Sequence, residues 1–141
     1  MRKITNNLYI GNREDTLTLL TKNESFDIII YLGQEIPTKL CFNCKPTCIH
    51  IPLNDGKNGL SKIRNTLFLV YIASLNKKIL IACRAGISRS VSVTTAVYAL
   101  TQKISFDEAY KQIKAIVPES QPELNLLKEV RQITEELKCC I

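Results

Sequence analysis

The segment 78–90 constrains the fold of this chain more than any other stretch of its sequence. The apolar residues 79–82 lead directly to Cys83, Gly86 follows, and Arg89 stands six positions after the cysteine. Beyond Arg89 the residues are small or β-branched and have a helical pattern. A strand that ends at a cysteine, turns tightly and opens a helix forms a ring of backbone N–H groups, which binds anions. We therefore predict an anion site with a thiol, favoured as the thiolate, at its floor and a guanidinium at its rim.

Short apolar runs alternate with segments of helical periodicity along the rest of the chain. We expect strands at 8–10, 28–32, 48–51 and 79–82, and helices at about 13–20 and 60–75 and over the C-terminal third, where capping boxes stand at Ser105–Glu108 and Ser120–Glu123. The run 28–32 is continuously apolar, which is typical of a strand covered on both faces. This alternation predicts a single α/β domain over residues 1–141, with a mostly parallel sheet of four to five strands flanked by helices.

Length and charge narrow the class of protein. A chain of 141 residues can bury the core of one domain, and its net charge of +6 suits an anionic substrate. No apolar run reaches the ~18 residues of a membrane span. The first residues lack the apolar core of a signal peptide. We therefore expect a cytoplasmic protein with no membrane or nucleic-acid partner, and the oligomeric state stays open.

Three cysteines lie close to the only histidine of the chain. Cys41, Cys44, Cys48 and His50 could hold zinc in a tetrahedral site. The alternative is a set of buried or redox-linked cysteines, because Cys48 and His50 fall on an expected strand and cytosolic thiols are usually reduced. We favour this alternative, assign His50 a structural role and expect no metal in the functional site.

Residues 83–90, called the signature loop below, resemble the loop of the cysteine-dependent protein phosphatases: a Cys, five residues and an Arg, followed by Ser or Thr. The run Ala-Gly-Ile-Ser-Arg-Ser is close to the form found in the small dual-specificity branch. The likeness covers nearly the whole chain, since 8–11 is similar to the family's opening strand and 51–55 to the segment that carries its general acid. The resemblance implies a phosphotyrosine-phosphatase-like fold. It also implies cofactor-free, metal-independent hydrolysis of phosphotyrosine, and of phosphoserine and phosphothreonine, in phosphorylated proteins through a phosphocysteine intermediate.

The resemblance also implies a role for individual residues. Cys83 would attack phosphorus, Arg89 would hold two phosphate oxygens, and Ser90 would hydrogen-bond the thiolate. Asp55 would protonate the leaving group and then take a proton from water. The implied substrate-binding residues are Arg84, Ala85, Gly86, Ile87, Ser88 and Arg89. Without the resemblance, the Gly/Asn-rich segment around Asp55 indicates a turn-forming residue. For Arg84, a solvated position on the rim of the loop and a substrate-binding role are equally good interpretations.

Two positions depart from the family pattern. The family usually has a His immediately before the nucleophile, where it orders the loop, whereas this chain has Ala82. We expect this change to weaken or shift the activity but not to abolish it. Many relatives place Asn or Gln in the C-terminal loop to position the hydrolytic water. Glu123 stands there in this chain, with Gln121 and Asn125 nearby, so that role has no assigned residue.

Other functions remain open at this point. A pseudophosphatase would bind phosphorylated partners in the same loop without turnover, and Ala82 is the observation that supports it. A rhodanese-type sulfurtransferase also has a loop that starts at Cys and contains Arg and Gly, but that loop is typically one residue shorter. A zinc-dependent nucleic-acid binder would rest on the cysteines near His50 and the net charge alone.

Overall fold

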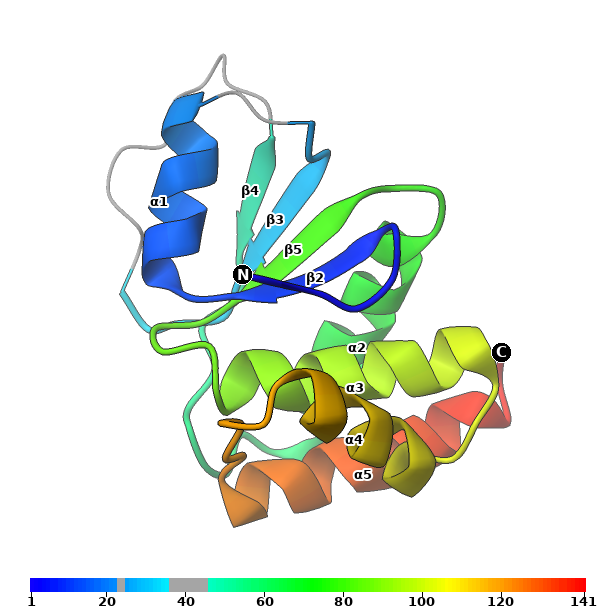
Figure 1. Cartoon of the computed structure of the whole chain (residues 1–141). Coiled ribbons are helices and arrows are strands. Elements are labelled where there is room, and N and C mark those ends of the chain that lie inside the picture. Colours follow the sequence, from blue (N-terminus) through cyan, green and yellow to red (C-terminus); the bar gives the residue numbers. More distant parts are fainter. Residues whose placement is uncertain (23–24, 36–45) are drawn as a thin grey trace.

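A five-stranded sheet forms the centre of the computed structural model, which describes residues 1–22, 25–35 and 46–141 (Figure 1). The elements in chain order are β1 (Arg2–Lys3), β2 (Leu8–Gly11), α1 (Arg13–Lys22), β3 (Ile28–Tyr31), β4 (Thr47–His50), α2 (Leu60–Ser74), β5 (Ile79–Ala82), α3 (Arg89–Gln102), α4 (Phe106–Ile116) and α5 (Leu124–Lys138). The strand order is β1-β2-β5-β3-β4, and only β1 runs antiparallel to its neighbour. The predicted α/β fold with a mostly parallel sheet is therefore confirmed.

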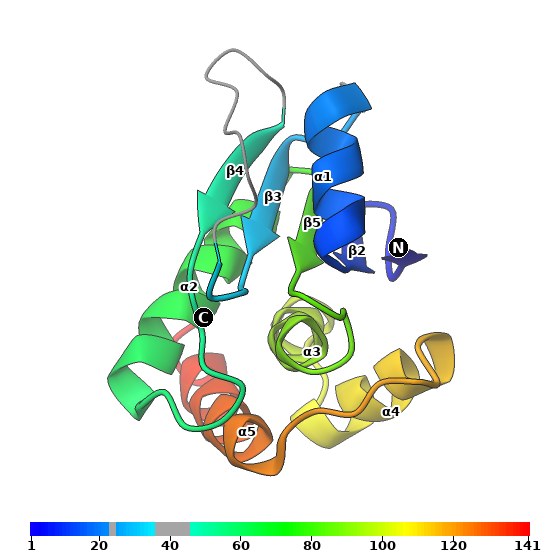
Figure 2. The same cartoon turned by 90° about the vertical axis from the view of Figure 1, so that its left-hand side faces the viewer.

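Helices cover both faces of the sheet (Figures 1 and 2). Helix α1 packs on one face, and α2, α3, α4 and α5 gather on the other. Successive strand residues point to opposite faces. Ile29 and Leu80 accordingly join the cluster on the α1 side, and Ile30 and Ile81 join the larger cluster on the other side. This explains the unbroken apolar runs of β3 and β5, since both faces of these strands are buried.

Helix α3 passes through the interior of the molecule. It contacts β2 and β5 on one side and α2, α4 and α5 on the others. Its residues 90–97, 99 and 100 are all buried, and they are Ser, Thr, Ala and Val except for one Leu. Small side chains let the neighbouring elements approach closely around the helix. The N-terminus of α3 is thereby fixed, and the signature loop leads directly into it.

No helix within the described residues is long and apolar enough to cross a membrane.

The two predicted capping boxes have different outcomes. Ser105 caps α4, with its hydroxyl accepting a hydrogen bond from the Glu108 N–H (3.1 Å). The box at Ser120 is wrong: α5 begins at Leu124, and Glu123 caps it through a hydrogen bond from the Leu126 N–H (2.9 Å). Pro122 explains the difference, because a proline disfavours helical backbone in the residue before it. Strand β1 was not expected, since two residues carry no periodicity.

Cys48 and His50 lie on β4, whereas Cys41 and Cys44 lie outside the described residues. Cys48 is half-buried, and burial raises the pKa of its thiol. The Nε2 atom of His50 is 2.6 Å from the carbonyl oxygen of Gly33, which is a structural contact. Within residues 1–22, 25–35 and 46–141, no group of three or more Cys, His, Asp or Glu is placed to hold a metal.

Candidate active site

The signature loop lies at the C-terminal end of β5, between that strand and the N-terminus of α3. Cys83 is 2 % exposed at the bottom of the loop. Two backbone N–H groups donate to its sulfur, from Gly86 at 3.3 Å and from Ser90 at 3.4 Å. The thiol in turn donates to Ser90 Oγ at 3.2 Å, and this hydroxyl can reverse and donate to a thiolate. Three hydrogen-bonding groups thus surround the sulfur.

Gly86 is the position where the loop requires glycine. Its φ is +75°, and a Cβ added there would lie 2.9 Å from the carbonyl oxygen of Gly11. The Cys83 N–H donates to that same Gly11 oxygen at 3.4 Å, and the Arg13 N–H donates to the Arg84 carbonyl at 3.2 Å. The signature loop thus rests on the end of β2 and the start of α1, and any side chain at position 86 would push it away.

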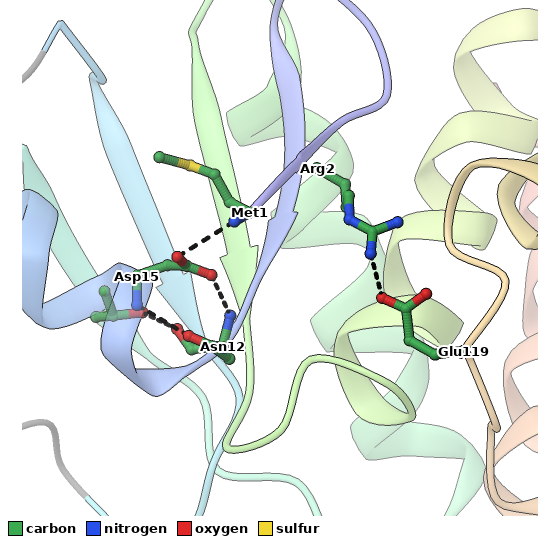
Figure 3. A network of polar contacts seen from close by, with 6 residues as sticks. Met1, Arg2, Asn12, Asp15 and Glu119 are labelled. Carbon is green, nitrogen blue, oxygen red and sulfur yellow. Dashed lines mark hydrogen bonds and ion pairs between the residues drawn. The ribbon is translucent and has the colours of Figure 1, made fainter.

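A polar network lies behind the signature loop, on the side of β2 and α1 (Figure 3). Asn12 and Asp15 bond reciprocally, each side chain accepting the other's backbone N–H at 2.9 Å. Arg2 pairs with Glu119 at 2.6 Å, which links β1 to the α4–α5 connection. A cavity of about 230 Å³ lies among these residues and reaches Gly86. The Arg2–Glu119 pair is half-exposed, so it contributes little stability. The Asn12–Asp15 pair fixes the start of α1, on which the loop rests.

Asp55 meets the signature loop through a side-chain hydrogen bond. Its segment, residues 53–59, is called the acid segment below. The Ser88 hydroxyl donates to Asp55 Oδ1 at 2.5 Å and accepts from the Glu123 N–H at 2.9 Å. The Arg89 Nη1 donates to the carbonyl oxygen of Leu53 at 3.2 Å, where the acid segment begins. The structure thus brings together Cys83, Ser90, Arg89 and Asp55, which the sequence analysis had selected from two distant stretches.

Both ends of the acid segment are anchored. Leu53 is fully buried and its N–H donates to the Leu32 carbonyl at 3.0 Å. At the other end, the carboxylate of Glu129 accepts from the Asn58 N–H (2.7 Å) and the Gly59 N–H (2.8 Å). Glu129 therefore caps α2 from a different helix, a role that the sequence analysis missed. Between the anchors, the Asn58 side chain bonds to the Asn54 backbone in both directions.

A match to a protein-family model identifies the family to which this arrangement belongs. The model described as the dual specificity phosphatase catalytic domain matches residues 8–136. The chain belongs to this family. The mouse protein "Dual specificity protein phosphatase 8" is 28 % identical over 143 residues, covering 98 % of this chain and 21 % of the mouse protein. The Caenorhabditis elegans "Tyrosine-protein phosphatase vhp-1" is 30 % identical over 132 residues, covering 90 % of this chain and 20 % of that protein. The chain thus spans about a fifth of the length of these curated relatives.

Solved structures of dual-specificity phosphatases share the fold. A mouse putative dual specificity phosphatase, complexed with zinc tungstate, superposes with a TM-score of 0.79 at 20 % identity, covering 99 % of this chain and 89 % of that one. Human DUSP28 superposes with a TM-score of 0.74 at 15 % identity and full coverage of both chains. The predicted phosphatase fold is therefore confirmed.

Ala82, where this dual-specificity phosphatase domain departs from the family pattern, is completely buried. It pairs with Tyr31 in the register of β5 and β3, and both side chains join the cluster under α1. Tyr31 is 1 % exposed, and a Cβ added to Gly33 would lie 2.6–2.7 Å from its ring and hydroxyl oxygen. The aromatic ring of Tyr31 therefore occupies space beside position 82, where the family pattern of the sequence analysis has a histidine. The sequence analysis treated Tyr31 only as a strand residue.

Tyr31 also reaches the edge of the active site. It lines a cavity of about 130 Å³ together with Gly33, Gln34, Glu35, Arg84 and Arg89. Burial raises the pKa of Tyr31, and the nearby charges of Cys83 and Glu35 act in the same direction. Arg13 and Arg89 oppose this shift without cancelling it. The phenol is thus neutral at ordinary pH and forms one wall of the space beside the two arginines.

The carboxylate of Glu123 is occupied by its own helix. Besides capping α5, it accepts a hydrogen bond from the Asn125 side chain at 3.1 Å. It also lies close to the acid segment, since a Cβ on Gly56 would be 3.8 Å from Glu123 Oε2. Gln121 and Asn125 are exposed. The residue that positions the hydrolytic water therefore stays unassigned.

Proposed function

We propose that this domain hydrolyses phosphotyrosine, and phosphoserine and phosphothreonine, in phosphorylated proteins through a phosphocysteine intermediate. The observation that carries the proposal is the meeting of the acid segment with the signature loop. Asp55 is bonded to Ser88 at 2.5 Å within the same loop whose N–H groups surround the Cys83 sulfur. Membership of the dual specificity phosphatase family supports the same chemistry. We assign the catalytic domain to residues 1–141.

In the first step the Cys83 thiolate attacks phosphorus, an S–P bond forms and the bond to the leaving oxygen breaks. Asp55 donates a proton to that oxygen, so that it leaves as an alcohol or phenol. Arg89 holds two of the equatorial phosphate oxygens, because a planar guanidinium can donate two parallel hydrogen bonds. The contact of its Nη1 with Leu53 orients the guanidinium before substrate arrives. The backbone N–H groups of residues 84–89 supply the other donors.

In the second step a water molecule attacks the phosphocysteine. Asp55, now a carboxylate, takes a proton from the water, and the S–P bond breaks to release inorganic phosphate. Cys83 leaves as a thiolate, which the Ser90 hydroxyl and the N–H groups of Gly86 and Ser90 stabilise. The same three donors thus assist the thiolate as nucleophile and as leaving group.

The surroundings of the signature loop support a protein substrate, and the chemistry of Cys83 supports a location. Arg84 and Arg89 line the same cavity, where Arg84 would contact anionic groups of a phosphorylated protein substrate. The variable positions of the loop hold Ile87 and Ser88 rather than lysines. This favours protein substrates over the phosphoinositides or RNA 5′-phosphates taken by lysine-bearing relatives. A reduced Cys83 is essential to the reaction, and we therefore propose a cytoplasmic location.

The test uses p-nitrophenyl phosphate in the presence of a chelator. We expect turnover by the wild type, none by Cys83→Ser, and a reduction by Asp55→Ala that is smaller than the ~10²–10⁴-fold typical of general acid catalysis, because p-nitrophenolate leaves readily without protonation. Cys48→Ser, which changes a cysteine on β4, is the matched control and should keep wild-type activity. Equal turnover by the wild type and Cys83→Ser would overturn the proposal. A wild type that binds phosphopeptides tightly without hydrolysing them would instead support the pseudophosphatase alternative. A panel of phosphotyrosine, phosphoserine and phosphothreonine peptides then defines the preference.

A further inference from the structure

We propose that Ser88 is the positioning residue of the general acid, so that its hydroxyl holds the Asp55 carboxyl group over the signature loop. This inference rests on the proposed function, in which Asp55 exchanges the proton. Ser88 would act through Asp55, whose Oδ1 accepts the Ser88 hydrogen bond while Oδ2 carries the proton.

The hydroxyl of Ser88 both donates and accepts a hydrogen bond, which fixes its orientation. A serine hydroxyl has one proton to donate and two lone pairs that can accept. Its proton goes to Asp55 Oδ1 at 2.5 Å, and the Glu123 N–H donates to it at 2.9 Å. Ser88 itself is 7 % exposed, so solvent has little access to compete for these bonds. The backbone of the α4–α5 connection thereby orients the hydroxyl toward the acid.

Helix capping does not account for the serine at this position. Ser88 is the N-cap residue of α3, where serine usually accepts a hydrogen bond from an N–H in the first turn of the helix. In this structure its side chain makes no capping hydrogen bond. The side chain is instead directed at Asp55. The local role that serine normally has at a helix start is therefore replaced by a contact with a residue 33 positions earlier.

Asp55 depends on this contact because little else restrains its side chain. The residue is exposed, and its neighbours at positions 54 and 56–59 are Asn, Gly and Lys. An exposed aspartate samples several rotamers, and a proton donor is effective only within hydrogen-bond reach of the leaving oxygen. The Ser88 bond selects one rotamer. Because it engages Oδ1, the other oxygen, Oδ2, is left to carry the proton to the leaving group.

The experiment compares Ser88→Ala with Ser88→Thr on aryl phosphates whose leaving groups differ in basicity. The alanine variant should lower kcat/KM about 10-fold or more for phenyl phosphate, which needs protonation of its leaving group, and only about 2-fold for p-nitrophenyl phosphate. Ser88→Thr keeps the hydroxyl and should restore most of the activity on phenyl phosphate. Ser92→Ala is the matched control, since it removes a buried hydroxyl of α3 that has no hydrogen-bond partner among the described residues.

A double-variant cycle separates positioning of Asp55 from damage to the loop. If Ser88 acts through Asp55, then Ser88→Ala should have almost no further effect on kcat/KM in an Asp55→Ala background. An equal loss for every leaving group, or an undiminished loss in the Asp55→Ala background, would overturn the inference while leaving the proposed function intact. Absence of turnover in the wild type would instead overturn the proposed function, and this inference with it. Thermal unfolding of each variant identifies any that has lost its fold.

Discussion

Tyr31 lies opposite Ala82 across the strand pair β3–β5, and both side chains are buried in the same cluster beneath α1. The family pattern described in the sequence analysis has a histidine at the position of Ala82. The ring of Tyr31 packs so closely that only a glycine fits at position 33. The base of the signature loop is thus supported by a bulky residue of β3, Tyr31, that packs beside a small residue of β5, Ala82.

The variant Ala82→His should destabilise the protein. The site is completely buried beside the Tyr31 ring, and an imidazole added to a packed core forces neighbours apart at about 1–3 kcal/mol. Combining it with Tyr31→Leu should recover part of this loss, because the two side chains share the same space. Urea denaturation of the wild type, both single variants and the double variant measures the coupling. Strictly additive effects would show that the two side chains do not compete for space.

Gly86→Ala should be more damaging than the same change at Gly59. Both glycines have positive φ, +75° and +92°, so a side chain strains the backbone at each by roughly 1–2 kcal/mol. A Cβ at position 86 would also lie 2.9 Å from the Gly11 carbonyl oxygen, whereas position 59 has no atom within 4 Å. We expect a lower melting temperature and weaker binding of vanadate, a phosphate analogue, for Gly86→Ala. Equal melting temperatures for the two variants would contradict the close contact.

Glu129→Ala should loosen the end of the acid segment. The change removes the acceptor of two N–H groups at the start of α2 and should destabilise the protein by about 1–2 kcal/mol. Glu129→Gln retains one acceptor oxygen and should lose less. Lys128→Ala, an exposed neighbour on α5, is the control in guanidinium denaturation. If Glu129→Ala unfolds at the same denaturant concentration as the control, the cap does not contribute to stability.

The buried phenol of Tyr31 should make the fold sensitive to alkaline pH. Burial raises its pKa above the ordinary value of 10.0, so the folded state keeps its proton where the unfolded state releases it. The stability that this provides is complete below pH 10 and decreases as the pH rises toward the pKa of the folded state. Tyr31→Phe should therefore lose less stability than the wild type between pH 9 and pH 11, as measured by urea denaturation at each pH. Parallel losses in the two proteins would refute this.

The elements predicted from the sequence are those whose cause is local. The apolar run 79–82 and the signature loop lie in short stretches whose residue types determine their structure, whereas Asp55 was selected through the family resemblance, and the structure brings all three together. Ser105 caps α4 as predicted, because that hydrogen bond closes over three residues.

The contacts that the sequence did not reveal join distant residues. Glu129 caps α2 from about seventy positions away, and its place on an amphipathic helix resembles that of any solvated glutamate. Tyr31 becomes part of the site only because β3 pairs with β5. Ser88 has the sequence signature of a helix cap, and its contact with Asp55 depends on how the acid segment folds back.

The anchoring of the acid segment has a consequence for the catalytic cycle. Leu53 is held by Leu32, Asn58 and Gly59 are held by Glu129, and the Asn58 side chain bonds the Asn54 backbone, so at most the few residues between these anchors can move. At ~3.3–3.6 Å per residue, so short a flap has a small amplitude, unlike the long lids that close over substrate in other enzymes. Asp55 is already in place before substrate arrives. In the proposed reaction, the acid segment would therefore need no large conformational change to bring the Asp55 carboxyl group to the phosphate.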